Sequence, residues 1–264
     1  MRVIDTHLHV DKMSIMDIQT LTIAGVEAAI VPTGHYLPLL TSADTLLMIW
    51  RNLSNFQVGV CKSLGLDIRV TLSVPFSGLS VEAAQACLKQ LPKYLENENV
   101  VGIGEIGLDS GSEDELRLFR TQLNIAKEHN LPVIVHTATP FEPQAIPILD
   151  QVIKIIHEEN FPIERVVLDH SGRNTLEARL DSGAMVGLGV CFDKLRPDDV
   201  AEIVLENPDK RDRFLINSEL GYFGQGYFSV PRAVLSMRQL GLPREEIEKM
   251  TWDNPKRFFN LTVK

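Results

Sequence analysis

Two histidines lie two residues apart near the start of the chain, in Asp5-Thr6-His7-Leu8-His9. The short apolar run around them predicts a buried strand, and residues i and i+2 of a strand point to the same side. We therefore expect Asp5, His7 and His9 to line one face. Two neighbouring imidazoles can chelate zinc, iron, nickel or manganese, although such a pair alone also fits two packed or solvent-exposed histidines.

Other ionisable residues stand where further apolar runs stop. Glu105 ends one run in Gly104-Glu105-Ile106-Gly107-Leu108-Asp109, and Glu219 follows another in Asn217-Ser218-Glu219. His136 and His170 end two more runs, whereas chance would scatter the histidines over helices and loops. A buried histidine or carboxylate is costly unless it is paired or coordinated. This clustering therefore predicts a metal site.

Eight short apolar runs are predicted to be the strands that carry these residues, because buried parallel strands read as apolar runs without alternation. The runs are Val3–His7, Ala28–Val31, Ile68–Val74, Val100–Glu105, Pro132–His136, Val166–His170, Ala184–Val190 and Phe214–Ser218. Helical spacing is found in Val81–Glu96, Asp114–Glu128, Gln144–Glu159, Thr175–Asp181, Pro197–Glu206, Val230–Leu240 and a last helix near Asn254-Pro255. The second run and the 34–66 region show the weakest pattern.

A strand followed by a helix, repeated eight times, predicts parallel strands joined by helical crossovers. Eight such repeats in 264 residues fit a closed (β/α)8 TIM barrel, an α/β fold of roughly 250 residues, better than an open sheet. We find no linker or composition shift and expect a single domain over residues 1–264. Barrel enzymes keep their active sites at the carboxyl ends of the strands, where the ionisable residues above are expected.

The composition narrows the possible functions. The net charge of −9 lowers the expectation of nucleic-acid binding without excluding it, because such binding usually relies on a basic surface. No apolar stretch approaches the ~20 residues of a membrane span, and the N-terminus does not read as a secretory signal. Three widely spaced cysteines argue against a disulfide framework and predict a reducing compartment such as the cytoplasm.

The motifs at Asp5–His9 and Gly104–Asp109, the strand-end His136 and His170, and Asn254-Pro255-Lys256-Arg257-Phe258 resemble those of TatD-type metal-dependent hydrolases. These are a branch of the amidohydrolase-like TIM barrels. The similarity runs in order over nearly the whole chain and is nearest to a divergent branch of predicted TIM-barrel metal hydrolases. It implies a hydrolase that uses two divalent metal ions, with zinc, manganese and magnesium as the candidates.

The resemblance also implies roles for individual residues. His7 and His9 would hold the first ion, Glu105 would bridge both ions, and His136 and His170 would hold the second. The family closes its eighth strand with Glu-Thr-Asp, whose Asp binds the first ion, and Glu219 is the matching residue here with a side chain one methylene longer. We expect Glu105 and Glu219 to act in catalysis, with Glu219 as the general base that then protonates the leaving group.

Further residues are expected to support this centre. Asp5 is predicted to fix the tautomer of a ligand histidine, and Asp109 to do the same near Glu105. Three residues are candidates for substrate binding: Arg173, which could grip an anionic group, His35 and Tyr222. The family's His-x-Arg is His136-Thr137-Ala138 in this chain, so the positions that contact phosphate differ.

Three functions are therefore kept open. The first is hydrolysis of a phosphodiester bond by metal-activated water, as in a DNase, which the family resemblance favours. The second is hydrolysis of a small-molecule ester, lactone or amide, which the acidic charge favours. The third is a non-hydrolytic enzyme or a non-catalytic metal-binding barrel. We expect a nucleic-acid or small-molecule substrate and no membrane partner, and the sequence predicts no oligomeric state.

Overall fold

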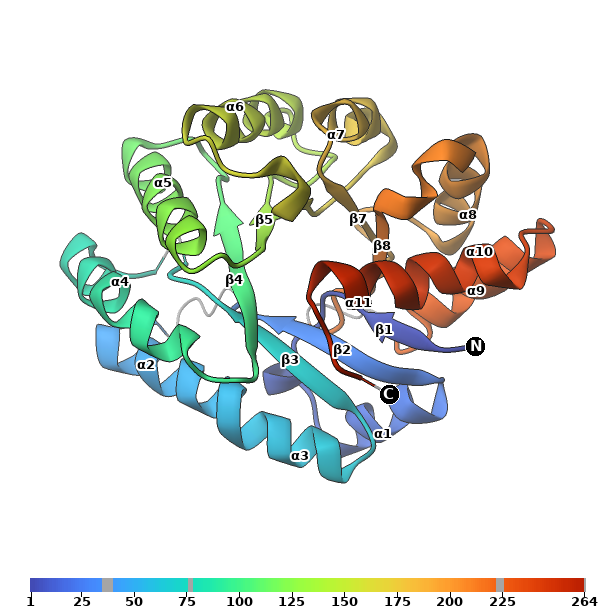
Figure 1. Cartoon of the computed structure of the whole chain (residues 1–264), viewed down its shortest axis with the longest axis horizontal. Coiled ribbons are helices and arrows are strands. Elements are labelled where there is room, and N and C mark those ends of the chain that lie inside the picture. The colour runs from blue at the N-terminus through green and yellow to red at the C-terminus, as the bar shows by residue number, and fades with distance from the viewer. Residues whose placement is uncertain (35–39, 76–77, 222–225, 264) are drawn as a thin grey trace.

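The computed structural model describes residues 1–34, 40–75, 78–221 and 226–263. Within these ranges eight parallel strands form one sheet in the order β1 to β8, each paired with the next along the chain. The strands are β1 Val3–Asp5, β2 Val26–Pro32, β3 Asp67–Leu72, β4 Val100–Gly107, β5 Val133–His136, β6 Val166–Leu168, β7 Met185–Gly189 and β8 Phe214–Asn217. The expected (β/α)8 TIM barrel is confirmed (Figure 1).

The segments that follow β1 and β8 bring the two ends of the sheet together. Leu8 and Leu220 form a parallel bridge, and the backbone N–H of His9 donates to the Leu220 carbonyl at 2.7 Å. The N–H of Glu219 donates to the His7 carbonyl at 2.8 Å. The same hydrogen bonds that nearly close the barrel therefore place three candidate ligands side by side.

Helices surround the strands (Figure 1). The α-helices are α1 Ile15–Ile23, α2 Ala43–Arg51, α3 Val58–Ser63, α4 Val81–Leu95, α5 Glu113–Glu128, α6 Ala145–Glu158, α7 Leu176–Ser182, α8 Pro197–Glu206, α9 Ser229–Gln239, α10 Arg244–Glu248 and α11 Asn254–Phe258. Short 3-10 or π segments are η1 Val10–Lys12, η2 Asn52–Gln57, η3 Ile163–Arg165, η4 Arg173–Thr175, η5 Pro208–Arg213 and η6 Lys249–Asp253. The predicted helices are present, whereas α1, α2, α3 and α10 were not predicted. Within the described ranges, none of the helices combines the length and apolarity of a membrane span.

Two apolar clusters hold the barrel together. The larger one lies between the strands and the surrounding helices and includes Leu72, Trp50 and Phe119. The smaller one includes strand residues of the opposite face, among them Ile30 and Leu215, together with C-terminal residues. Those C-terminal residues are Trp252, Phe259, Leu261 and Val263. The last segment of the chain therefore packs against the strands from their amino ends and leaves the carboxyl ends to the polar residues.

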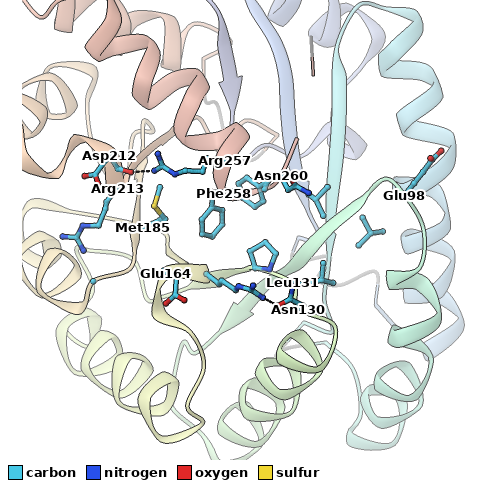
Figure 2. Close-up of a pocket in the computed structure, with 16 residues that line it drawn as sticks. Glu98, Asn130, Leu131, Glu164, Met185, Asp212, Arg213, Arg257, Phe258 and Asn260 are labelled. Carbon is cyan, nitrogen blue, oxygen red and sulfur yellow. Dashed lines mark hydrogen bonds between the residues drawn. The ribbon is translucent and has the colours of Figure 1, made fainter. Parts of the chain in front are cut away.

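A cavity of about 880 Å³ lies at those amino ends, between the starts of β4 to β8 and the helix α11. Figure 2 shows its lining, in which Arg257 reaches the Asp212 carbonyl at 2.6 Å. Arg213 donates to the Leu180 carbonyl at 2.7 Å and to that of Ala184 at 3.3 Å. These arginines tie α11 and the strand starts to neighbouring backbone. This cavity is thus at the opposite end of the strands from the clustered histidines.

Candidate metal centre

The candidate ligands converge at the carboxyl ends of the strands. His7 and His9 follow β1, Glu105 lies on β4, His136 ends β5, and His170 and Glu219 follow β6 and β8. Ligand atoms lie within 4.8 Å of one another in each of three groups: His7, His9 and Glu105; His7, His170 and Glu219; and Glu105, His136 and His170. Because the groups share members, they form one connected cluster.

Glu105 lies at the middle of this cluster. Its Oε1 atom is 3.1 Å from His7 Nε2 and 3.7 Å from His170 Nε2. His7 Nε2 is also 3.2 Å from His9 Nε2, and His170 Nε2 is 3.3 Å from Glu219 Oε1. Burial opposes ionisation of Glu105, but the surrounding histidines, His7 first, hold its pKa well below the usual value. A single carboxylate therefore joins the two histidine pairs.

Asp169 fixes the orientation of His7, a role that was predicted for Asp5. Burial opposes its ionisation, but a 2.6 Å hydrogen bond to His7 Nδ1 lowers the pKa of Asp169. This carboxylate therefore accepts the Nδ1 proton and leaves His7 Nε2 facing the cluster. Asn217 Nδ2 and the backbone N–H of His170 also donate to Asp169, at 3.0 and 2.9 Å.

Asp5 accepts hydrogen bonds from backbone N–H groups and not from an imidazole ring. Its Oδ1 accepts the backbone N–H of His7 at 3.2 Å and that of Ser218 at 3.1 Å. Burial is the main influence on this carboxyl and raises its pKa to about 6. Asp5 thereby links the segment after β1 to the segment after β8.

Replacing Asp169 by asparagine is expected to weaken zinc binding by ~10–100-fold, the usual effect of losing the partner of a ligand histidine. The amide is a poorer acceptor and no longer fixes the His7 tautomer. Zinc affinity is measured by competition with a chromogenic chelator, and Asp181→Asn, at an exposed position on α7, is the matched control. Wild-type zinc affinity in the Asp169 variant would contradict the assignment.

His136 and Asp109 form a second supported pair. His136 Nε2 lies 2.8 Å from Asp109 Oδ1. The buried carboxylate of Glu115, on α5, accepts the N–H groups of Asp109, Ser110 and Gly111 at 3.1, 2.9 and 2.8 Å. Asp109 therefore contacts a candidate ligand histidine, and Glu115 holds the loop that carries Asp109.

Lys194, which was not predicted to belong to the site, contacts Glu219 directly. It follows β7, its side chain is 5% exposed, and its Nζ lies 2.6 Å from Glu219 Oε2. Burial raises the pKa of Glu219 to about 7, although Lys194 opposes this. The ammonium group thus holds one carboxylate oxygen while the other, Oε1, faces the histidines. In the sequence Lys194 stands beside Asp193 and reads as an ordinary charged loop residue.

Two candidate ligands have unusual backbone conformations. His170 and Glu219 have φ angles of 62° and 49°. Left-handed φ values are uncommon outside glycine, and such residues cluster at functional sites because the surrounding fold must hold them. At both positions the turn directs a side chain inward just after its strand ends.

Of the three residues predicted to bind substrate, the structure describes only Arg173. Arg173 lies in the segment that follows β6, near the carboxyl ends of the strands. Acidic side chains of α8 surround it: Glu202 in close contact, Glu206 at 3.2 Å and Asp199 at 3.7 Å. An arginine with three acidic partners is less available for a substrate anion. His35 and Tyr222 lie outside the described residues.

The donor set fits divalent cations. Because Asp169 accepts the Nδ1 proton, His7 directs its Nε2 atom towards His9 Nε2 and Glu105 Oε1. Glu219 Oε1 is buried and accepts no hydrogen bond from the described residues. Converging acceptors need a proton or a cation between them. Burial opposes protonation of His7, but Glu105 and Asp169 raise its pKa well above the usual value. Imidazole and carboxylate ligands together suit zinc and manganese.

Comparisons with known proteins agree with this fold and donor set. The family described as TatD related DNase matches residues 4–260. An uncharacterised metal-dependent hydrolase of Methanocaldococcus jannaschii is 32% identical over 259 residues, which cover 98% of this chain and 100% of the relative. A similar protein of Bacillus subtilis, also an uncharacterised metal-dependent hydrolase, is 25% identical over 203 residues, covering 69% of this chain and 74% of the relative.

Solved structures share the fold. The TatD-like protein of Archaeoglobus fulgidus superposes with a TM-score of 0.78 at 25% identity, covering 98% of this chain and 100% of that protein. A phosphotriesterase homology protein of Escherichia coli, complexed with phosphate in its active site, has a TM-score of 0.69 at 16% identity, covers 98% of both chains and shares the fold. The chain therefore belongs to the TatD-related family and is a metal-dependent hydrolase.

Proposed function

We propose that the protein hydrolyses a phosphodiester bond at a centre of two divalent metal ions, zinc, manganese or magnesium. The observation that carries the proposal is the position of Glu105 Oε1 between His7 Nε2 and His170 Nε2. One carboxylate within reach of two histidine groups is the arrangement that a bridging ligand requires. The ligands would be His7, His9, Glu105, His136, His170 and Glu219.

Residues of the chain would transfer the proton and position the ligands in this reaction. When bound, divalent ions lower the pKa of a coordinated water from about 16 towards ~7 and polarise the oxygen that gains charge. Glu219 would accept the proton of the attacking water as the oxygen of that water bonds to phosphorus. It returns the proton to the leaving oxygen when that phosphorus–oxygen bond breaks. Lys194 holds Glu219 Oε2, and Asp169 and Asp109 hold His7 and His136 in place.

A second candidate function is hydrolysis of a small-molecule ester, lactone or amide by the same centre. The acidic partners of Arg173 favour it, because a nucleic-acid strand binds mainly through neutralisation of its phosphates by basic side chains. Both candidates need the same water-activating centre, so they differ in the substrate and not in the ligand set.

Metal removal and reconstitution test the proposal. The protein is stripped with a chelator, reloaded with zinc or manganese, and assayed by mass spectrometry for metal and with 4-nitrophenyl phosphodiesters, esters and anilides for activity. We expect more than one ion per chain and metal-dependent cleavage of the phosphodiester. Fewer than one ion per reconstituted, folded chain would rule out the two-metal centre. Cleavage of esters or anilides alone would favour the second candidate.

A further inference from the structure

A cleft of about 680 Å³ lies beside the candidate centre. It is formed by the segments that follow three neighbouring strands, β5, β6 and β7, and its lining includes Phe141, Asn174, Phe192 and Lys194. Lys194 also contacts Glu219 at 2.6 Å. The cleft therefore adjoins the candidate centre through Lys194, and a ligand in it would lie beside this partner of Glu219.

Two large aromatic side chains in this cleft are left uncovered. Phe141 is 75% exposed and Phe192 is 70% exposed, and they come from different loops. Neither belongs to the two apolar clusters that stabilise the barrel. Ligand sites are typically concave and lined by aromatic side chains beside a few polar groups. Two exposed phenylalanines that line one cleft beside the candidate centre have the features of such a site.

The loops that carry these side chains are already held together. Asn174 Nδ2, in the segment after β6, donates to the Pro140 carbonyl at 2.8 Å. A Cβ at Gly172 would lie 2.3 Å from Pro140 Cβ, so the two loops approach as closely as only glycine allows. The wall beside Phe141 is thus formed before a ligand arrives, which lowers the entropic cost of binding.

The charges around the cleft do not match a polyanion. Arg173 is paired with three acids, Arg196 lies 3.2 Å from Asp199, and Lys194 is paired with Glu219. Each basic side chain of the cleft therefore has an acidic partner. A long nucleic-acid strand gains most of its affinity from unopposed basic groups, whereas a single aromatic group needs none.

We propose that this cleft binds a flat aromatic group of the substrate between Phe141 and Phe192 while the hydrolysable bond lies at the metal centre. The substrate class would then be small aromatic phosphoesters or esters and not polynucleotides. The inference rests on the proposed hydrolysis, and it adds the residues that select the substrate.

Binding of paired phosphonates tests this cleft without relying on turnover. Phenylphosphonate and methylphosphonate carry the same anionic group and differ in the ring, and their affinities for the zinc-loaded protein are measured by calorimetry. We expect phenylphosphonate to bind about tenfold more tightly, a difference of the size of one aromatic stacking contact. Phe141→Ala and Phe192→Ala should bring the ratio of the two affinities towards one at unchanged metal content.

Two matched variants separate the loss of an aromatic ring in the cleft from the effect of removing any exposed phenylalanine. Phe192→Tyr keeps the ring and should keep the ratio. Phe56→Ala removes an exposed phenylalanine on η2 that is not among the residues lining the cleft and should leave the ratio unchanged. Equal affinities in the wild type, or a ratio that survives both alanine variants, would overturn the proposal.

Nucleotides of two lengths test the substrate class. Thymidine 5′-phosphate should bind at least as well as methylphosphonate, and a thymidine hexamer should bind no more than threefold more tightly than the mononucleotide. A gain of tenfold or more with length would overturn the small-molecule assignment. Hydrolysis of the nitrophenyl panel is measured on the same preparations. An active enzyme without phenyl preference would contradict only the cleft, and an inactive one would contradict the proposed hydrolysis.

Discussion

Glu105→Gln is expected to lower metal content below one ion per chain and to reduce hydrolysis by at least ~10³-fold. Glutamine keeps the shape of the side chain but removes the negative charge that lies between His7 and His170. A metal centre supplies several kcal/mol of transition-state stabilisation, and about 4 kcal/mol corresponds to roughly 10³-fold in rate. Metal content by mass spectrometry and kcat/KM with bis(4-nitrophenyl) phosphate measure the two effects.

Folding must be separated from metal loss in this experiment. Removing one partner of a buried ion pair typically costs about 3–5 kcal/mol, so metal is counted only in protein with native near-UV circular dichroism. Glu27→Gln, at an exposed position near the start of β2, is the control and should retain both ions and full activity. A native Glu105 variant with wild-type metal content and activity would show that Glu105 is not a ligand.

The barrel was predictable because its strands are buried on both faces. Each of the eight apolar runs overlaps an observed strand, including Ala28–Val31, which lies within β2 at Val26–Pro32. Local start and stop signals were also reliable where they were strong. Ser80 accepts the N–H of Ala83 at the start of α4, and Gly183 ends α7 in the left-handed conformation, with φ of 87°.

The helices of the 34–66 region were missed because their stability comes from tertiary contacts. Asn52, Ser54 and Asn55 are poor helix formers, yet they lie in the middle of a continuous helical stretch. The π segment η2 accommodates them, and Asn99 Nδ2 donates to the Ser54 carbonyl at 3.0 Å from the segment before β4. A local sequence pattern cannot reveal a partner that lies 45 residues away.

The candidate ligands were found by a rule that follows from the fold. Parallel strands end at one edge of a barrel, so ionisable residues that end apolar runs must meet there, and the structure brings all six together. Asp169 and Lys194 were missed because their roles depend on side-chain direction. Asp169 precedes a candidate ligand in sequence but serves a different one, His7, across the barrel.

The sequence also did not indicate which way the Arg173 side chain points. Arg173 follows His170 by three residues, which suggested a grip on substrate, but acids of α8 lie on the same side and pair with it. Those acids are remote in sequence, at positions 199 to 206. These ion pairs support the proposal that the exposed phenylalanines, and not Arg173, contact the substrate.

Glu219→Gln is expected to reduce kcat by ~10²–10⁴-fold, the usual contribution of a positioned general base, with most of the metal retained. The amide oxygen can still occupy the position of Oε1 near His170, but it cannot accept the proton of the attacking water. Metal content and kcat, measured on the same sample, therefore separate the role of a base from that of a ligand. A residue that served only as a ligand would lose metal and activity together.

Two further variants make the result decisive. Glu219→Asp keeps a carboxylate, matches the residue type that the family has at this position, and should recover part of the lost activity. Glu248→Gln, on α10 in an ion pair with Arg244, should behave as wild type. Activity within threefold of wild type in Glu219→Gln would exclude Glu219 as the base. The proton acceptor would then have to be sought among the other carboxylates near the candidate ligands, such as Asp169, which contacts both His7 and Asn217.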